Sequence, residues 1–148
     1  MKIKLLKTSI QYADSHLIKY GIEIIDDQKN ALIQKTKDII VEMIYREENL
    51  PLEKISSYIA KRVSYSYGYL ATLFSEMTYS SIENFIILQK IERAKQMILV
   101  EGLTLTEIAA RLNYSSVAHL SSQFKKTTGL TPSAFQAIIK KRRNNGNH

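Results

Sequence analysis

A twenty-residue pattern that occurs twice decides the fold: SYGYLATLFSEMTYSSIENF at residues 66–85 and SVAHLSSQFKKTTGLTPSAF at residues 116–135. Five positions hold the same residue in both copies when the numbering is shifted by 50. They are Ser66, Leu70, Phe74, Thr78 and Phe85, which pair with Ser116, Leu120, Phe124, Thr128 and Phe135. Ile59-Ala60 returns as Ile108-Ala109 with a shift of 49. The chain therefore contains two copies of one small helical unit.

The pattern also predicts how each unit is built. Leu and Phe four residues apart attach one face of a central helix to the core and leave the opposite face exposed. Ser66 and Ser116 are expected to cap these helices, and Ile59-Ala60 sets a small residue beside a bulky one so that the next helix can cross closely. A helix held by its buried face with its other face exposed is what helix-turn-helix recognition of the DNA major groove requires.

Six helices are predicted after residue 50, at about 52–62, 66–77, 81–99, 105–112, 116–127 and 132–142. Their starts are marked by Pro51, by Ser80 with Glu83, by Thr104 with Glu107, and by Thr131 before Pro132. The long helix at 81–99 is apolar nearly all round at residues 85–88. We therefore expect it to link the two units and to be clamped between them.

The N-terminal part has a different pattern. Two short apolar runs, at residues 3–5 and 22–25, flank a helical segment at about 9–19. Because such runs with a glycine between them are typical of strands, they predict a small β-α-β-like remnant.

An amphipathic helix is expected to follow, with Asp26 as its N-cap and its end near Arg46. The predicted fold class is therefore mainly α. Residues 1–50 form an N-terminal segment that either packs on the first unit or mediates self-association, and residues 51–148 form the double unit.

Charge and composition bound the function. Residues 1–50 carry 8 Lys and Arg against 8 Asp and Glu, so the net charge of +7 lies entirely in residues 51–148. This distribution favours a polyanionic partner. The chain has no Cys, and no Ser-His-Asp ordering, phosphate-binding glycine loop or metal-ligand spacing is visible, so we expect no enzymatic activity, no catalytic residue, no cofactor and no metal. No apolar run has the length of a membrane span, so a cytoplasmic protein with no membrane partner is expected.

Basic residues of the second half are candidates for contact with DNA phosphates. They are Lys61, Arg62, Arg93, Lys125, Lys126, Lys140, Lys141, Arg142 and Arg143. Thr131 joins them because the helix that it opens offers N–H groups to an anion. For the terminal run 140–143 a solvated tail is the alternative.

Several ordered motifs resemble the DNA-binding domain of the AraC/XylS regulator family over about Pro51 to Lys140. They are Ile91-Glu92-Arg93-Ala94-Lys95 with Met97, Leu105 to Ala109, Asn113-Tyr114-Ser115-Ser116, Phe124-Lys125-Lys126 and Gly129-Leu130-Thr131-Pro132. The resemblance implies a monomeric seven-helix domain whose two recognition helices enter adjacent major grooves of double-stranded DNA. It also implies the base-facing positions Tyr67, Gly68, Ala71, Thr72, Val117, Ala118, His119 and Ser122.

The sequence departs from that family at three places. Asn113-Tyr114 stands for a usual Gly-Phe pair, although Asn tolerates the left-handed backbone that Gly would supply. Tyr79 stands where Gly is usual, and Leu120 replaces a common Phe.

The base-facing positions are mostly small or apolar, with Thr72, His119, Ser122 and Gln123 as the polar ones. Bidentate reading of guanine or adenine is therefore largely missing, and affinity is expected to rest on phosphates, thymine methyl groups and shape. Of the tyrosines near the first recognition helix we single out Tyr67, because Tyr69 precedes the core residue Leu70 and is expected to be partly buried.

The sequence thus predicts a DNA-binding transcription regulator, with the transcription machinery as a further partner. The alternative is a helical protein-protein interaction adaptor that retains the fold without specific DNA readout. The first fifty residues resemble the end of a ferredoxin-like, heavy-metal-associated segment found ahead of this domain in some longer relatives, but they lack the cysteines that would bind metal.

Overall fold

The computed structural model describes residues 9–46 and 48–146, with side chains from Asp26 onward. Its elements in chain order are α1 (Ser9–Tyr45), α2 (Ile55–Val63), α3 (Tyr67–Thr78), α4 (Ile82–Gln96), the π-helical turn η1 (Met97–Glu101), α5 (Leu105–Arg111), α6 (Val117–Thr128) and α7 (Pro132–Asn145). No strand occurs among these residues, so the fold is mainly helical. None of the described helices is long and apolar enough to cross a membrane.

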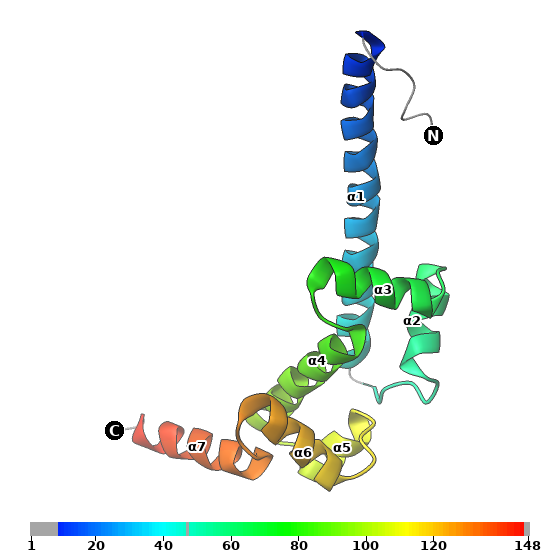
Figure 1. Ribbon diagram of the computed structural model, residues 1–148. Helices are drawn as coiled ribbons and strands as arrows, with labels where there is room; N and C mark the ends of the chain where they lie inside the picture. The colour runs from blue at the N-terminus through cyan, green and yellow to red at the C-terminus, as the bar shows by residue number, and fades with distance from the viewer. Residues whose placement is uncertain (1–8, 47, 147–148) are drawn as a thin grey trace.

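The helices form two groups connected by α4 (Figure 1). In the first group α2 packs against α3, and α1 contacts α2, α3 and α4. In the second group α5 packs against α6, while α7 contacts α6 and η1. Because α6 also packs on α4, one continuous core runs through both groups, from Ile40 of α1 to Phe124 of α6.

Side-chain capping explains where most of the helices begin. The hydroxyl oxygens of Ser66 and Ser116 accept hydrogen bonds from the backbone N–H groups three residues ahead, at 3.3 and 3.0 Å. Thr104 and Thr131 cap α5 and α7 in the same way, each at 3.1 Å. Each cap satisfies one of the donors that a helix N-terminus leaves without an intrahelical partner. The predicted starts at these four positions are confirmed.

Two other predicted starts are wrong. The helix expected from Pro51 begins at Ile55, because the preceding Leu50 is buried and its backbone N–H donates to the Arg111 carbonyl, which anchors this stretch outside the helix. α4 is capped by Ser81 and not by Ser80. The backbone N–H of Ser80 is already bound to the Thr78 hydroxyl at 3.3 Å, which keeps Ser80 in the preceding turn.

The expected β-α-β-like remnant is also wrong where the structure describes it. Residues 22–25 belong to α1, which continues without a break through Asp26 to Tyr45, so Asp26 is no N-cap. The other expected strand, at residues 3–5, lies outside the described residues. Apolar residues at 18, 22, 25 and 32 also recur with helical spacing, and a short apolar run alone does not distinguish a strand from a helix.

Figure 1 shows that the N-terminal part of α1 extends beyond the other helices. Its C-terminal part contributes Ile33, Ile40, Met43 and Ile44 to the core. Thr36 is fully buried in the same face, and its hydroxyl donates to the Leu32 carbonyl at 2.8 Å, so burial leaves no polar group without a partner there.

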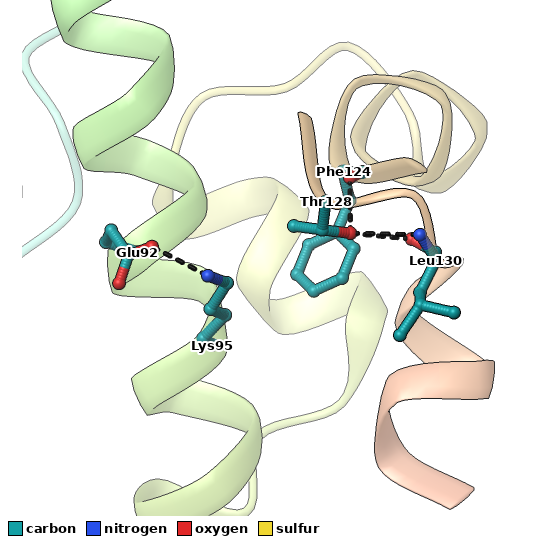
Figure 2. A network of polar contacts seen from close by, with 5 residues as sticks. All are labelled: Glu92, Lys95, Phe124, Thr128 and Leu130. Carbon is teal, nitrogen blue, oxygen red and sulfur yellow. Dashed lines mark hydrogen bonds and ion pairs between the residues drawn. The ribbon is translucent and has the colours of Figure 1, made fainter. Parts of the chain in front are cut away.

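The two copies end alike. The Thr128 hydroxyl lies 2.8 Å from the Phe124 carbonyl oxygen and accepts from the Leu130 N–H at 3.1 Å (Figure 2). Thr78 makes the equivalent contacts with Phe74 and Ser80 in the first copy.

Aromatic pairs then hold the next helix. Phe74 meets Phe85 of α4 with ring centroids 5.8 Å apart, and Phe124 meets Phe135 of α7 at 5.5 Å. The sequence repeat is therefore a repeat of structure, in which α4 and α7 occupy equivalent places.

The residue that ends α3 differs from the one that ends α6. Both have left-handed backbone, with φ of 58° at Tyr79 and 83° at Gly129. A side chain makes this conformation unfavourable by about 1 to 2 kcal/mol, and Tyr79 is 93% exposed, so packing does not offset the strain. A Cβ added at Gly129 meets nothing within 4 Å, so strain alone decides a substitution there.

These two positions therefore predict opposite effects on stability. Tyr79→Gly raises the free energy of unfolding by up to about 1 kcal/mol, after the larger chain entropy of the unfolded glycine variant is subtracted. Gly129→Ala lowers it by about 1 to 2 kcal/mol. Urea unfolding of both variants measures these changes, and a shift of the same sign in both would contradict the strain argument.

Candidate nucleic-acid interface

α3 and α6 each bury one face and expose the other. Leu70 and Phe74 of α3, and Leu120 and Phe124 of α6, are almost completely buried. Five exposed positions of the two helices are equivalent after the shift of 50. They are Gly68, Tyr69, Thr72, Ser75 and Glu76 on α3, and Ala118, His119, Ser122, Lys125 and Lys126 on α6. These two faces are the candidate interface.

The first face differs in part from the sequence prediction. Tyr67 is half-buried, and its hydroxyl donates to the Glu83 carboxylate at 2.7 Å; burial, and next this hydrogen bond, raise the pKa of Tyr67 above its ordinary value. Ala71 is also half-buried, whereas Gly68 and Thr72 are exposed. The Thr72 hydroxyl donates to the Gly68 carbonyl at 3.0 Å. Tyr67 thus lies at the border of the exposed face, where its hydrogen bond to Glu83 attaches it to α4.

The more exposed aromatic residue of this face is Tyr69, for which the sequence predicted partial burial. Its side chain is 47% exposed and stacks on the 50% exposed Tyr65, with ring centroids 5.4 Å apart. The signal was present in the helical spacing, because Tyr69, Thr72 and Glu76 recur at i, i+3 and i+7 on the side opposite Leu70. Adjacency to a core residue in the sequence does not imply burial in a helix.

On α6, Ala118, His119 and Ser122 are exposed as predicted, and Val117 is half-buried against the core. His119 Nδ1 lies 3.1 Å from the Ser115 hydroxyl, and its ring meets the edge of Tyr114 at 5.1 Å.

Tyr114 is the support of this histidine. It is buried, its hydroxyl donates to Gln123 at 2.5 Å, and burial raises its pKa. The Lys90 ammonium lies 4.8 Å from the centre of the same ring. Lys90 of α4 thus supports Tyr114, and Tyr114 supports His119 in the first turn of α6.

The predicted phosphate-facing residues fall into separate places. Lys125 and Lys126 are exposed in the last turn of α6. Lys61 and Arg62 are exposed at the end of α2, where Lys61 pairs with Glu53 at 3.0 Å and Arg62 stacks on Tyr58 with 3.4 Å to the ring centroid.

The run 140–143 is helical, since α7 continues to Asn145, and it leads away from α6 (Figure 1). Arg143 donates to the Leu99 carbonyl of η1 at 3.0 Å. Thr131 uses its hydroxyl oxygen to cap α7, which leaves the remaining N–H groups of that first turn as the contact that it offers.

Arg93 is a correction, because it does not face a phosphate. It is only 7% exposed, and its guanidinium donates to the Glu101 carboxylate at 2.6 Å. Glu101 also pairs with Arg111 at 3.5 Å, and Tyr45 lines the same cleft. The first ion pair joins α4 to η1 and the second joins η1 to α5, so the role of Arg93 is structural.

No three His, Asp or Glu side chains among the described residues come together as metal ligands.

A family model described as a helix-turn-helix domain matches residues 59–138, which include α3, α4, α5 and α6 with all of both candidate faces. The chain belongs to the AraC/XylS family of helix-turn-helix proteins. The F1 operon positive regulatory protein of Yersinia pestis is 32% identical to this AraC-family chain over 108 residues, which are 72% of the chain and 35% of that regulator. The chain thus spans about a third of that relative.

Solved structures share the fold. The DNA-binding domain of AdpA, solved in complex with a target DNA, is 20% identical with a TM-score of 0.62, covering 76% of this chain and 96% of that one. The C-terminal domain of AraT, a response regulator from Geobacillus stearothermophilus, is 20% identical with a TM-score of 0.62, covering 72% and 84%. At 20% identity these two structures show that the AraC-family chain has the same fold, and nothing more.

The role of Arg93 leads to a prediction about stability. Glu101→Gln removes the charge that the buried guanidinium faces, so the free energy of unfolding falls by about 3 kcal/mol. The matched control is Glu92→Gln, which removes the exposed ion pair with Lys95 (2.7 Å, Figure 2) and changes stability by less than about 0.5 kcal/mol. Urea unfolding compares the two, and equal losses would mean that the Arg93 pair is no more than a surface contact.

Proposed function

We propose that the chain binds double-stranded DNA through the exposed faces of α3 and α6, and that it acts as a transcription regulator. The observation that carries the proposal is the repeated geometry, in which two equivalent helices bury one face and expose the other while both contact α4. The shared fold with the AdpA domain, whose structure was solved with a target DNA, supports it. The Yersinia pestis relative is named as a regulator, which supports a regulatory and non-enzymatic role.

The two faces enter adjacent major grooves in this proposal. α4 has 15 residues and is therefore about 22 Å long, and with its flanking turns it separates α3 from α6 along the duplex. Successive major grooves on one face of DNA lie about 34 Å apart. Gly68, Tyr69 and Thr72 face bases in one groove, and Ala118, His119 and Ser122 face bases in the next. The half-buried Tyr67, Ala71 and Val117 border these contacts.

Phosphate contacts come mainly from the second copy. Lys125 and Lys126 close the α6 face, whereas Ser75 and Glu76 stand at the equivalent positions of α3, which contains no Lys or Arg. Lys61 and Arg62 contact phosphates beside the groove that α3 enters. The N-terminus of α7 after Thr131 binds a phosphate beside the groove that α6 enters. Lys140, Lys141 and Arg142 extend the basic surface along α7.

We further propose that residues 51–148 are the DNA-binding domain and that residues 1–50, whose helix α1 packs on the first copy, also serve self-association. The extension of α1 beyond the other helices supports this division (Figure 1). Contact with the transcription machinery is part of the same proposal.

The alternative function is a protein-protein adaptor with the same fold. One observation favours it, namely that the only charge on α3 is the carboxylate of Glu76. The two functions differ in whether the chain binds a polyanion.

The test is binding of the purified chain to fluorescent duplexes of about 20 base pairs, followed by anisotropy while salt is titrated. Tight binding with a steep negative salt slope is expected. Lys125→Ala and Lys126→Ala are each expected to weaken binding to every duplex and to reduce the slope by about one, because each removes one phosphate contact.

Two comparisons make the test specific. Lys35→Ala removes the same charge from an exposed position of α1 and is expected to leave the slope unchanged. Substitutions at Val117, Ala118 or His119 are expected to change sequence preference more than salt dependence. If the wild-type chain binds no duplex at low salt, DNA binding is refuted and the adaptor function is favoured.

A further inference from the structure

At the start of each recognition helix, the residue before the N-cap contacts a side chain of the first turn, and the two pairs differ in chemistry. In the first copy Tyr65 and Tyr69 stack, with ring planes inclined by 23°. Positions 115 and 119 are equivalent to them, and there Ser115 and His119 make a polar contact. The same place on the repeated unit thus holds an aromatic pair in one copy and a polar pair in the other.

The tyrosine pair is exposed and already ordered. About half of each side chain is accessible to solvent, and both precede the core residue Leu70 in the chain. A tyrosine has few rotatable bonds, and stacking restricts these rings further, so little conformational entropy is lost when they contact a partner. Exposed aromatic surface fixed in this way is suited to recognition.

The rest of the α3 face lacks the groups that read purines. The Thr72 hydroxyl is bound to the Gly68 carbonyl, which leaves its methyl group as the part able to contact a partner. Arg, Lys, Asn and Gln, which pair with guanine or adenine edges, do not occur in α3. The feature of the major groove that the two tyrosine rings and the Thr72 methyl group can recognise is the methyl group of thymine.

We propose that Tyr65 and Tyr69 are the specificity-determining residues of the first copy and that they select a thymine-containing half-site by contact with its 5-methyl groups. The inference rests on the proposed DNA-binding function. Glu76, at the place where α6 has Lys126, agrees with it, because this half-site is then held by apolar contact more than by neutralised phosphates.

The test uses duplexes that the full chain selects from a randomised pool. In one half-site at a time every thymine is replaced by deoxyuridine, which removes the methyl group and leaves base pairing intact. For the wild-type chain we expect about three- to five-fold weaker binding per contacted methyl in one half-site, the factor that corresponds to burial of one methyl group, and little change in the other.

Variants connect that loss to the tyrosines. In the double variant Tyr65→Ala/Tyr69→Ala the deoxyuridine effect is expected to disappear from that half-site, while His119→Ala, the matched change in the second copy, retains it. Tyr65→Phe/Tyr69→Phe keeps the rings and is expected to retain it as well. Circular dichroism melting establishes that each variant is folded.

Three results would overturn the inference. One is an equal deoxyuridine effect in the wild-type chain and in the alanine variant. Another is unchanged binding and selectivity of the alanine variant, which would mean that the tyrosine pair contacts a protein partner and not DNA. Failure of the wild-type chain to select any duplex would refute the proposed function and this inference together, and it is distinguished from the first two by the absence of binding.

Discussion

The positions of α3 and α6 depend on their packing against α4. This helix buries Ile82, Ile86, Ile91 and Ala94, and it contacts α1 and α3 on the side of the first copy and α6 on the side of the second. Protein interiors are packed too densely for such a helix to shift without loss of contacts, so the separation of the two exposed faces is set by the core. The aromatic pair of Phe74 and Phe85 and the ion pair of Arg93 and Glu101 hold the two ends of α4 to their own groups. A fixed separation is what a protein needs in order to meet two grooves of one duplex.

The two copies share a framework and differ on their surfaces. Equivalent residues cap the helices, bind the turns that follow them and hold the next helix. Burial explains why Leu and Phe recur, and hydrogen bonds to the backbone explain why Ser and Thr recur. The exposed positions diverge, from Tyr69 and Glu76 on α3 to His119 and Lys126 on α6. Because the framework is common, the difference in chemistry is a difference in what each face can bind. One copy offers cationic and hydrogen-bonding groups, and the other offers aromatic and methyl surface.

Much of this fold could be predicted from the sequence because its signals are local. The caps at Ser66, Thr104, Ser116 and Thr131 depend on a hydroxyl three residues before a backbone N–H, and the repeat depends on residues four apart on one helix face. Residues 22–25 could not be assigned correctly, since a short apolar run suits a strand or a helix and the continuation of α1 is what decides between them.

The candidate site was predicted less completely, for a related reason. Arg93 resembles any surface cation until the fold brings Glu101 to its guanidinium, and Tyr67 resembles an exposed aromatic residue until Glu83 of α4 binds its hydroxyl. Which cations are available to a phosphate depends on tertiary contacts that the chain order does not reveal. The exposed positions of α6, by contrast, were implied by the family resemblance, and they agree with the burial of Leu120 and Phe124 on the opposite face.

Hydroxyl-radical footprinting of the chain on a selected duplex tests most directly whether α4 holds the exposed faces of α3 and α6 at the separation of two adjacent major grooves. Two protected segments on one face of the DNA, centred about 10 base pairs or one helical turn apart, are the predicted result. A single protected segment, or two whose spacing departs from a helical turn, would contradict it.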